Sequence, residues 1–246
     1  MSFITRARKA LILLSRRKFA VVAATERVAA AVEHLEAIRL AGAETLIDIG
    51  ANKGQFSLAF RTLRPGARII AFEPLPDAGD RYLRIFGRDT NVTLHRVALA
   101  KESGEAEFYV TDRDDSSSLL KPGKGQSDAY GVNTARTIRV PLRRLKDLVS
   151  IETLPRPIFV KIDVQGAELD VLKGCEELEQ ADLVYVELSF VELYEGQPLA
   201  DEVIAYLQSR GFLLAGVFNQ ASTDLFGPTQ ADFLFKRAVP SNAALA

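Results

Sequence analysis

Two acids and two glycines around residue 50 have the types and spacing of a site for a nucleotide-type cofactor. The segment TLIDIGANKGQF, residues 45–56, contains Asp48, Gly50 and Gly54, and the segment IIAFEP carries Glu73 before its final proline. A tight glycine turn leaves backbone amides free at the start of a helix, and an acid about 20 residues further on can bind ribose hydroxyls. The sequence therefore predicts a strand, a glycine turn and a helix, followed by a second strand that ends on a carboxylate.

The glycine spacing narrows the class of cofactor. It is G-x-x-x-G rather than the G-x-G-x-x-G of dinucleotide-binding proteins, whose extra glycine lets the backbone approach a pyrophosphate. We therefore do not expect a pyrophosphate at Gly50. An ionised carboxylate has about four acceptor positions, so Glu73 can accept hydrogen bonds from both ribose hydroxyls. The alternative is an ordinary strand, turn and helix with Glu73 on the surface.

A second pair of acids lies at the ends of two later strands. In VKIDVQGAELDVLKG, residues 160–174, a buried strand ends on Asp163, and Gly166 starts a helix. In VYVELS, residues 184–189, the next strand carries Glu187 near its end. Open α/β sheets bind ligands at the carboxyl ends of their strands, so we expect both acids to face one cleft.

Strands that alternate with helical segments indicate an α/β fold with a mostly parallel sheet and helices on both faces. After the first strand, the expected strands are 68–73, 91–99, 105–110, 137–140, 158–163, 183–188, 211–217 and 231–236. The expected helices are 54–63, 77–86, 142–149, 167–172 and 199–210. The last two strands should pair antiparallel, because the loop expected at 219–230 leaves no room for a helix.

The segment 112–134 is rich in Ser, Gly, Asp and Lys and has no hydrophobic period. Long aperiodic segments in a compact domain are commonly binding loops or lids. The alternative for its middle part, residues 122–131, is plain disorder.

The length of 246 residues suits one main α/β domain. Lys and Arg number 31 against 32 Asp and Glu, so there is no overall field to attract nucleic acid, and we expect none as a partner. Cys175 is the single cysteine, which excludes an internal disulfide and suits a cytoplasmic protein.

Residues 1–40 form a basic segment with 8 basic and 3 acidic side chains. We expect a helical arm that packs on the core or on a second subunit, followed by the main domain at 41–238 and a tail at 239–246. The alternative is an amphipathic helix that touches anionic lipid through residues 1–24, which would make the protein membrane-associated. The segment contains two apolar runs, residues 10–14 and 19–24, and neither is long enough to span a membrane.

Taken together, DIGANKGQFS, AFEP, DSSSLL, VKIDVQGAELDVLKG and VYVELS resemble the FkbM family of S-adenosylmethionine (SAM) dependent methyltransferases over roughly residues 44–237. The resemblance implies a Rossmann-like, seven-stranded sheet in the order 3-2-1-4-5-7-6. Many members of the family have Glu where this chain has Gln165, so any role of that position as a base or a metal ligand is in doubt.

The resemblance implies SAM as cofactor and O-methylation of a hydroxyl on a carbohydrate, glycolipid or secondary-metabolite acceptor. The glycine turn would then pass under the methionine part of SAM, with Asp48 and Gly50 holding its amino and carboxyl end. The remaining cofactor-binding candidates are Asn52, Lys53, Gly54, Glu73 and Ser117. The alternatives are that Lys53 points to water and that the serines at 116–118 cap a turn.

The resemblance also implies that a hydroxyl must lose its proton while it attacks the methyl group. Asp163 is the first candidate for the base or for orienting the hydroxyl, and Glu187 is the second. The two acids could instead hold a divalent ion through oxygen ligands, an alternative that we do not favour.

Two other functions stay open from the sequence. One is a nicotinamide-dependent oxidoreductase, against which the glycine spacing counts. The other is a non-catalytic scaffold of the same fold whose N-terminal arm binds a partner or a membrane. We also expect that the chain can form a homo-oligomer.

Overall fold

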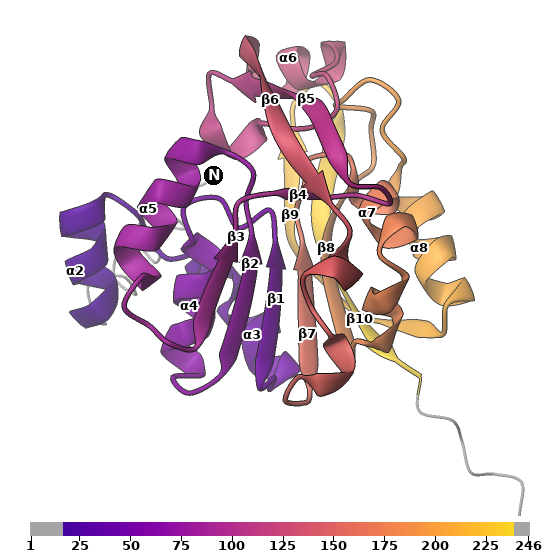
Figure 1. Cartoon of the computed structure of the whole chain (residues 1–246). Helices are drawn as coiled ribbons and strands as arrows, with labels where there is room; N and C mark the ends of the chain where they lie inside the picture. The colour runs from indigo at the N-terminus through magenta and orange to yellow at the C-terminus, as the bar shows by residue number, and fades with distance from the viewer. Residues whose placement is uncertain (1–16, 239–246) are drawn as a thin grey trace, which may run out of the picture.

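The computed structural model describes residues 17–238 and contains a seven-stranded sheet in the order β3-β2-β1-β7-β8-β10-β9 (Figure 1). Five strands are parallel and β10 is antiparallel to both of its neighbours. The seven strands are β1 (Thr45–Ile49), β2 (Arg68–Phe72), β3 (Val92–His95), β7 (Ile158–Ile162), β8 (Leu183–Ser189), β9 (Phe212–Thr223) and β10 (Gly227–Arg237). Counted among these seven alone, the order is the predicted 3-2-1-4-5-7-6, and the antiparallel pairing of the last two strands is confirmed.

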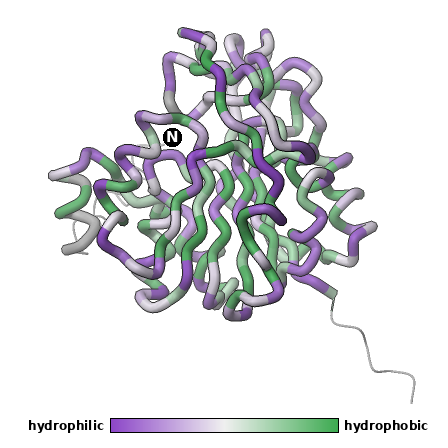
Figure 2. Tube along the Cα trace, viewed as in Figure 1, coloured by the Kyte–Doolittle hydropathy of each residue, from purple (hydrophilic) through white to green (hydrophobic). Residues whose placement is uncertain are grey.

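Helices cover both faces of this sheet, as predicted. Successive residues of β1 alternate between two hydrophobic clusters, because Leu46 belongs to one and Ile47 to the other. Figure 2 shows hydrophobic residues concentrated in the strands between the helices. One cluster is closed by α3 (Leu35–Ala41), α4 (Gln55–Leu63) and α5 (Pro76–Phe86), and the other by α7 (Glu168–Gly174) and α8 (Ala200–Ser209).

A smaller sheet, in the order β4-β6-β5, lies over the carboxyl edge of the large one (Figure 1). Its strands are β4 (Ala98–Leu99), β5 (Gly104–Thr111) and β6 (Thr134–Arg143). The prediction of one continuous strand at 91–99 was wrong, because the chain leaves β2 after His95 and then pairs with β6. The helix expected at 142–149 was also wrong, since β6 continues to Arg143 and only the short 3-10 turn η3 (Leu145–Asp147) follows.

The segment expected as a lid or as disorder has regular structure. It contains the 3-10 turn η2 (Asp114–Ser116) and the helix α6 (Lys124–Tyr130). The Gly123 amide donates to the Leu193 carbonyl at 2.9 Å, and the Glu195 amide donates to the Lys121 carbonyl at 2.9 Å. These backbone bonds join the segment to the chain that follows β8.

The loop expected at 219–230 is instead a β-hairpin. β9 continues to Thr223, and β10 begins at Gly227, so only a short turn separates them. Gly227 has a φ of +66°, which glycine adopts readily, and it directs the chain back along β9.

The N-terminal part of the described chain belongs to the folded core. It contains α2 (Arg17–Glu26), the turn η1 (Val32–His34) and α3. Ala30, Leu35 and Ile38 are buried in the cluster under α4, so this segment packs on the core. Most of the segment expected to touch lipid, and the tail at 239–246, lie outside the described residues.

Within residues 17–238, no helix has the length and apolar character needed to cross a membrane. The expected homo-oligomer stays a prediction.

Candidate functional site

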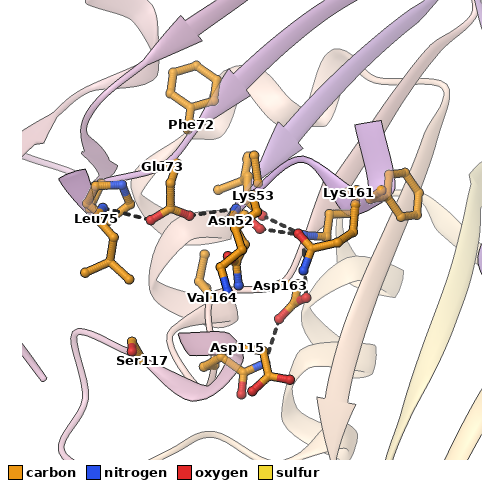
Figure 3. Close-up of a pocket in the computed structure, with 18 of the residues that line it drawn as sticks. Asn52, Lys53, Phe72, Glu73, Leu75, Asp115, Ser117, Lys161, Asp163 and Val164 are labelled. Atoms are coloured by element: carbon orange, nitrogen blue, oxygen red, sulfur yellow. Dashed lines mark hydrogen bonds and ion pairs between the residues drawn. The ribbon is translucent and has the colours of Figure 1, made fainter. Parts of the chain in front are cut away.

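A cleft of about 400 Å³ lies where the carboxyl ends of β1, β2 and β7 meet the small sheet. Pockets of ~300–1,000 Å³ are typical for small molecules and cofactors. Gly50, Glu73 and Asp163 all line the cleft, so the first and the second acidic motif meet at one site. Figure 3 shows Glu73 on one side of this site and Asp163 on the other.

The two glycines of the turn lie close to different parts of the protein. Gly50 has a φ of +74°, and a Cβ placed on it would lie 1.8 Å from the Asp163 carbonyl oxygen. A side chain at Gly50 would therefore meet the backbone after β7 rather than a ligand in the cleft. Gly54 has a φ of +87° and packs against Phe86 of α5, and it does not line the cleft. Both glycines thus allow close packing around the cleft.

The Glu73 carboxylate is oriented by two backbone amides. Asn52 donates to Oε2 at 2.7 Å and Leu75 donates to Oε1 at 2.8 Å (Figure 3). Burial raises the pKa of Glu73 to about 7, although both amide bonds act in the opposite direction. Each oxygen keeps acceptor capacity, because a carboxylate has about four acceptor positions. Glu73 can therefore accept two further hydrogen bonds from a ligand.

Asp48 lies beneath the turn rather than in the cleft. Its side chain is fully buried, Ser57 donates to Oδ2 at 2.7 Å, and the Lys161 Nζ is 3.4 Å from Oδ1. Asp48 is not among the cleft-lining residues. Any influence of Asp48 on a ligand must therefore pass through Ser57, Lys161 or the turn itself.

Lys161 on β7 links the Gly50 turn to the carboxylates of Asp48 and Asp163. It was not predicted from the sequence. Its Nζ donates to the Gly50 carbonyl at 2.7 Å and lies 3.5 Å from Oδ2 of Asp163. Burial opposes the charge of Lys161, but the Asp163 and Asp48 carboxylates outweigh it and hold the pKa above its usual value. The signal in the sequence is a lysine inside an otherwise apolar strand.

A hydrogen-bond network surrounds Asp163 on the other side of the cleft. The Gln165 amide nitrogen donates to Oδ1 of Asp163 at 2.7 Å and to Oε2 of Glu187 at 3.0 Å. The expectation that Glu187 faces the same cleft as Asp163 was wrong, because Glu187 does not line the cleft and is connected to it only through Gln165. Burial, followed by the charges of Asp163, Asp232 and Glu168, holds the pKa of Glu187 well above its usual value.

The turn that carries Gln165 is held from both sides. Gln165 has a φ of +57°, a left-handed conformation that costs a non-glycine residue about 1–3 kcal/mol. The Ser118 hydroxyl donates to the Gln165 carbonyl at 2.7 Å. The Glu168 carboxylate accepts the amides of Val164 and Gly166 at 3.1 and 3.0 Å. These contacts stabilise a conformation that the local sequence does not favour.

The remaining predicted residues lie along the walls. Asn52 and Lys53 line the cleft next to Gly50. Ser117 also lines it, and its Oγ accepts the Thr111 amide at 3.1 Å. An apolar wall was not predicted and consists of Phe72, Leu75, Val97, Leu99, Phe108 and Leu119.

A further wall comes from the N-terminal segment between Arg27 and His34, six of whose residues line the cleft. Nδ1 of His34 lies 2.9 Å from the Tyr185 hydroxyl and 3.3 Å from Oδ2 of Asp232. Gln55, another lining residue that we did not predict, has a buried Oε1 without a hydrogen-bond partner in the described part of the chain. An acceptor atom is thus available to a ligand donor.

No cluster of three or more His, Cys, Asp or Glu residues within 17–238 is arranged to hold a metal ion. The cleft instead offers a carboxylate for hydroxyl donors on one side and an acid with a bridging amide on the other.

Comparison with known proteins identifies a family. The methyltransferase FkbM domain profile matches residues 48–214. The 2-O-methyltransferase NoeI of Sinorhizobium fredii is 35% identical over 160 residues, which cover 62% of this chain and 66% of NoeI. The hexuronic acid methyltransferase AglP of Haloferax volcanii is 31% identical over 147 residues, covering 59% of this chain and 56% of AglP.

The chain thus spans less than two thirds of the length of either relative. A solved structure of magnesium protoporphyrin IX methyltransferase from Synechocystis, with bound SAM, aligns at 11% identity and a TM-score of 0.44 over 83% of this chain and 76% of that one.

Proposed function

The chain belongs to the FkbM family of methyltransferases, and from this premise we propose that it transfers the methyl group of SAM to a hydroxyl of a carbohydrate, glycolipid or secondary-metabolite acceptor. The names of two relatives support the acceptor class, since NoeI is a 2-O-methyltransferase and AglP a hexuronic acid methyltransferase.

One observation carries the proposal, namely that Glu73 and Asp163 line the same cleft from opposite sides of the Gly50 turn. A cofactor and an acceptor that bind on these two sides would meet in the middle. Holding two reactants in an aligned contact can supply about 7–11 kcal/mol of a barrier. Placement of the two ligands is therefore the main task of the protein.

The cofactor side has groups that fit SAM. The acceptor capacity left on Glu73 suits a ribose diol, and the partnerless Oε1 of Gln55 suits an ammonium group. The apolar wall around Phe72 and Leu99 suits an adenine ring. When bound, SAM supplies an electrophilic methyl group on a sulfonium.

We assign Glu73 to the ribose, and Gly50, Asn52, Lys53 and Ser117 to the other contacts of the cofactor, because all of them line the cleft. Asp48 and Gly54 lie behind this surface and shape the turn.

Asp163 is assigned to the acceptor hydroxyl. Its side chain is 37% exposed while that of neighbouring Lys161 is 8% exposed, so Asp163 is the member of this ion pair that a ligand can reach. Its carboxylate can accept the hydroxyl hydrogen bond and take the proton as the oxygen attacks, a contribution typically worth about 100- to 10,000-fold in rate. Glu187 acts on Asp163 through Gln165.

The proposal is tested by a transfer assay with methyl-labelled SAM over a panel of sugars, uronic acids, glycolipids and hydroxylated metabolites. We expect label in at least one hydroxylated acceptor. Calorimetry with SAM and with NADH distinguishes the alternatives: binding of NADH and not SAM would contradict the proposal and support an oxidoreductase. SAM binding without transfer to any acceptor would support a non-catalytic scaffold.

A further inference from the structure

We propose that Gln165 is a positioning residue whose side-chain amide joins Asp163 and Glu187, in the place where a cation would otherwise be needed between two acids. The proposal rests on the proposed function in one respect, since it takes Asp163 as the group that faces the acceptor.

The first argument is the count of donors. Two ionised carboxylates can only accept hydrogen bonds, so they repel each other unless a donor lies between them. The amide nitrogen of Gln165 has two hydrogens, and it contacts Asp163 at 2.7 Å and Glu187 at 3.0 Å. Both hydrogens are thus used on the two acids. A neutral group does what a bound ion would do, without bringing a charge.

The second argument is the orientation of the amide. Its Oε1 lies 2.9 Å from the Tyr194 hydroxyl, whose single proton is shared with the Ser116 carbonyl at 2.8 Å, and the Gln126 amide donates to the Tyr194 oxygen at 3.1 Å. A rotated amide would place Oε1 against two carboxylates and its NH₂ group against a hydroxyl that already has a donor. The two carboxylates, which can only accept, therefore select the orientation in which the nitrogen faces the acids, and the Tyr194 contact is compatible with it.

The third argument is the backbone at this position. Gln165 has a φ of +57° and is followed by Gly166 at +103°. Glycine adopts the left-handed region more easily than glutamine does. The local conformation therefore does not explain a glutamine here, whereas the three side-chain contacts do.

The charges around this pair favour a donor between the two acids, and Gln230 is a further side-chain donor to Glu187. The groups that face the pair are Lys161 from β7, Glu168 from α7, Asp232 from β10, and the phenols Tyr130, Tyr185 and Tyr194. Lys161 lies beside Asp163, and Asp232 and Glu168 add negative charge beside Glu187. Without the Gln165 amide, Asp163 would repel Glu187 more strongly when Glu187 ionises.

The first test compares the full-length wild type with Gln165→Met, which keeps the side-chain length and removes the donors. Losing the donor to Glu187 destabilises only the ionised form of Glu187, whose pKa is held well above its usual value, so the loss is present at high pH and becomes smaller as Glu187 is protonated. We expect the melting-temperature deficit of Gln165→Met to be about 3 °C or more larger at pH 8 than at pH 5.5.

Gln126→Met is the matched control, because Gln126 donates to Tyr194 and not to an acid. Its deficit should be the same at both pH values. An equal deficit for Gln165→Met at both pH values would show a purely structural side chain and would overturn the proposal.

The second test places a third carboxylate at this position. In Gln165→Glu, three acids would lie within hydrogen-bond reach of one another, a set of oxygen ligands that suits Mg²⁺ or Mn²⁺. Titration with MnCl₂, followed by calorimetry, should show binding at least about ten-fold tighter in Gln165→Glu than in the wild type. Equal affinity of the two proteins for Mn²⁺ would mean that the amide does not take the place of a cation.

Neither test requires turnover, so their outcome is separate from that of the proposed function. SAM titration of the same samples decides the cofactor independently. We expect Gln165→Met to bind SAM within a few fold of the wild type, because Gln165 contacts the acids and not the Glu73 side of the cleft.

Discussion

The two sides of the cleft are held in different ways. On the cofactor side, Glu73 is fixed by the backbone amides of Asn52 and Leu75. On the acceptor side, Asp163 is fixed by the side chains of Lys161 and Gln165. The oxygen of the Gln165 amide in turn contacts the hydroxyl of Tyr194, which lies beyond β8.

Backbone amides are supplied by almost any residue, so the cofactor side can be described by a short motif with a few required positions. The acceptor side needs particular donors and acceptors from distant parts of the chain. Substitutions there should change which acceptor is used, while the cofactor side stays the same.

The largest loss of stability is expected at Gly50, where the turn on one side of the cleft approaches the Asp163 backbone on the other. In Gly50→Ala, the new Cβ would lie 1.8 Å from the Asp163 carbonyl oxygen, in a residue with a φ of +74°. We expect the free energy of unfolding to fall by about 3–5 kcal/mol, measured by urea denaturation. Gly131→Ala is the control, because Gly131 also has a positive φ but no atom lies within 4 Å of its Cβ position.

Strain alone should destabilise Gly131→Ala by about 1–2 kcal/mol. If both variants lost the same stability, the close approach of the two sides would not matter.

Asp163→Asn tests the acceptor side alone. Removing the carboxylate should lower kcat by about 100- to 10,000-fold, because an amide cannot take the hydroxyl proton. The SAM dissociation constant should stay within a few fold of the wild-type value. Calorimetry and the labelled-methyl assay measure the two quantities, and a loss of SAM binding would move Asp163 to the cofactor side.

Glu73→Ala tests the cofactor side in the same way. Hydrogen bonds to a charged group are worth about 1.5–3 kcal/mol, so we expect SAM to bind about 10- to 150-fold more weakly. Glu107→Ala, in which an exposed acid of β5 is removed, is the control and should bind SAM normally. An unchanged dissociation constant in Glu73→Ala would remove Glu73 from the cofactor site.

The smallest expected effect is a pH dependence of SAM binding. The pKa of Glu73 is raised to about 7 by burial, and ribose hydroxyls that donate to it favour its ionised form. Binding should therefore lower this pKa and release a proton, so affinity should rise about ten-fold from pH 6 to pH 8 and level off above. In Glu73→Gln the calorimetric affinity should be flat over this range, and a persisting slope would assign it to another group.

The same contrast explains how much could be predicted from the sequence. The cofactor side was predicted because a strand, a glycine turn and an acid follow one another within 30 or so residues, and each is a local signal. The apolar runs of β7 and β8 likewise predicted Asp163 and Glu187 at one edge. The sheet order came from the resemblance to a family.

The errors arose where tertiary contacts decide the structure. Residues 91–99 alternate like one strand, but Ala98 pairs with β6 and not with β2. Lys161 was missed because the carbonyl and the two acids that hold its charge come from three different positions of the fold. The N-terminal wall was missed because no short motif connects residues 27–34 with the rest of the cleft.

The position of β10 between β8 and β9 has a consequence for synthesis of the chain on the ribosome. β9 is made first, carries no charged residue in FLLAGVFNQAST, and has no neighbour in the sheet until β10 has emerged. Uncharged apolar strands with free edges are sites of aggregation. The nascent protein must therefore keep this strand from other chains until β10 has left the ribosome.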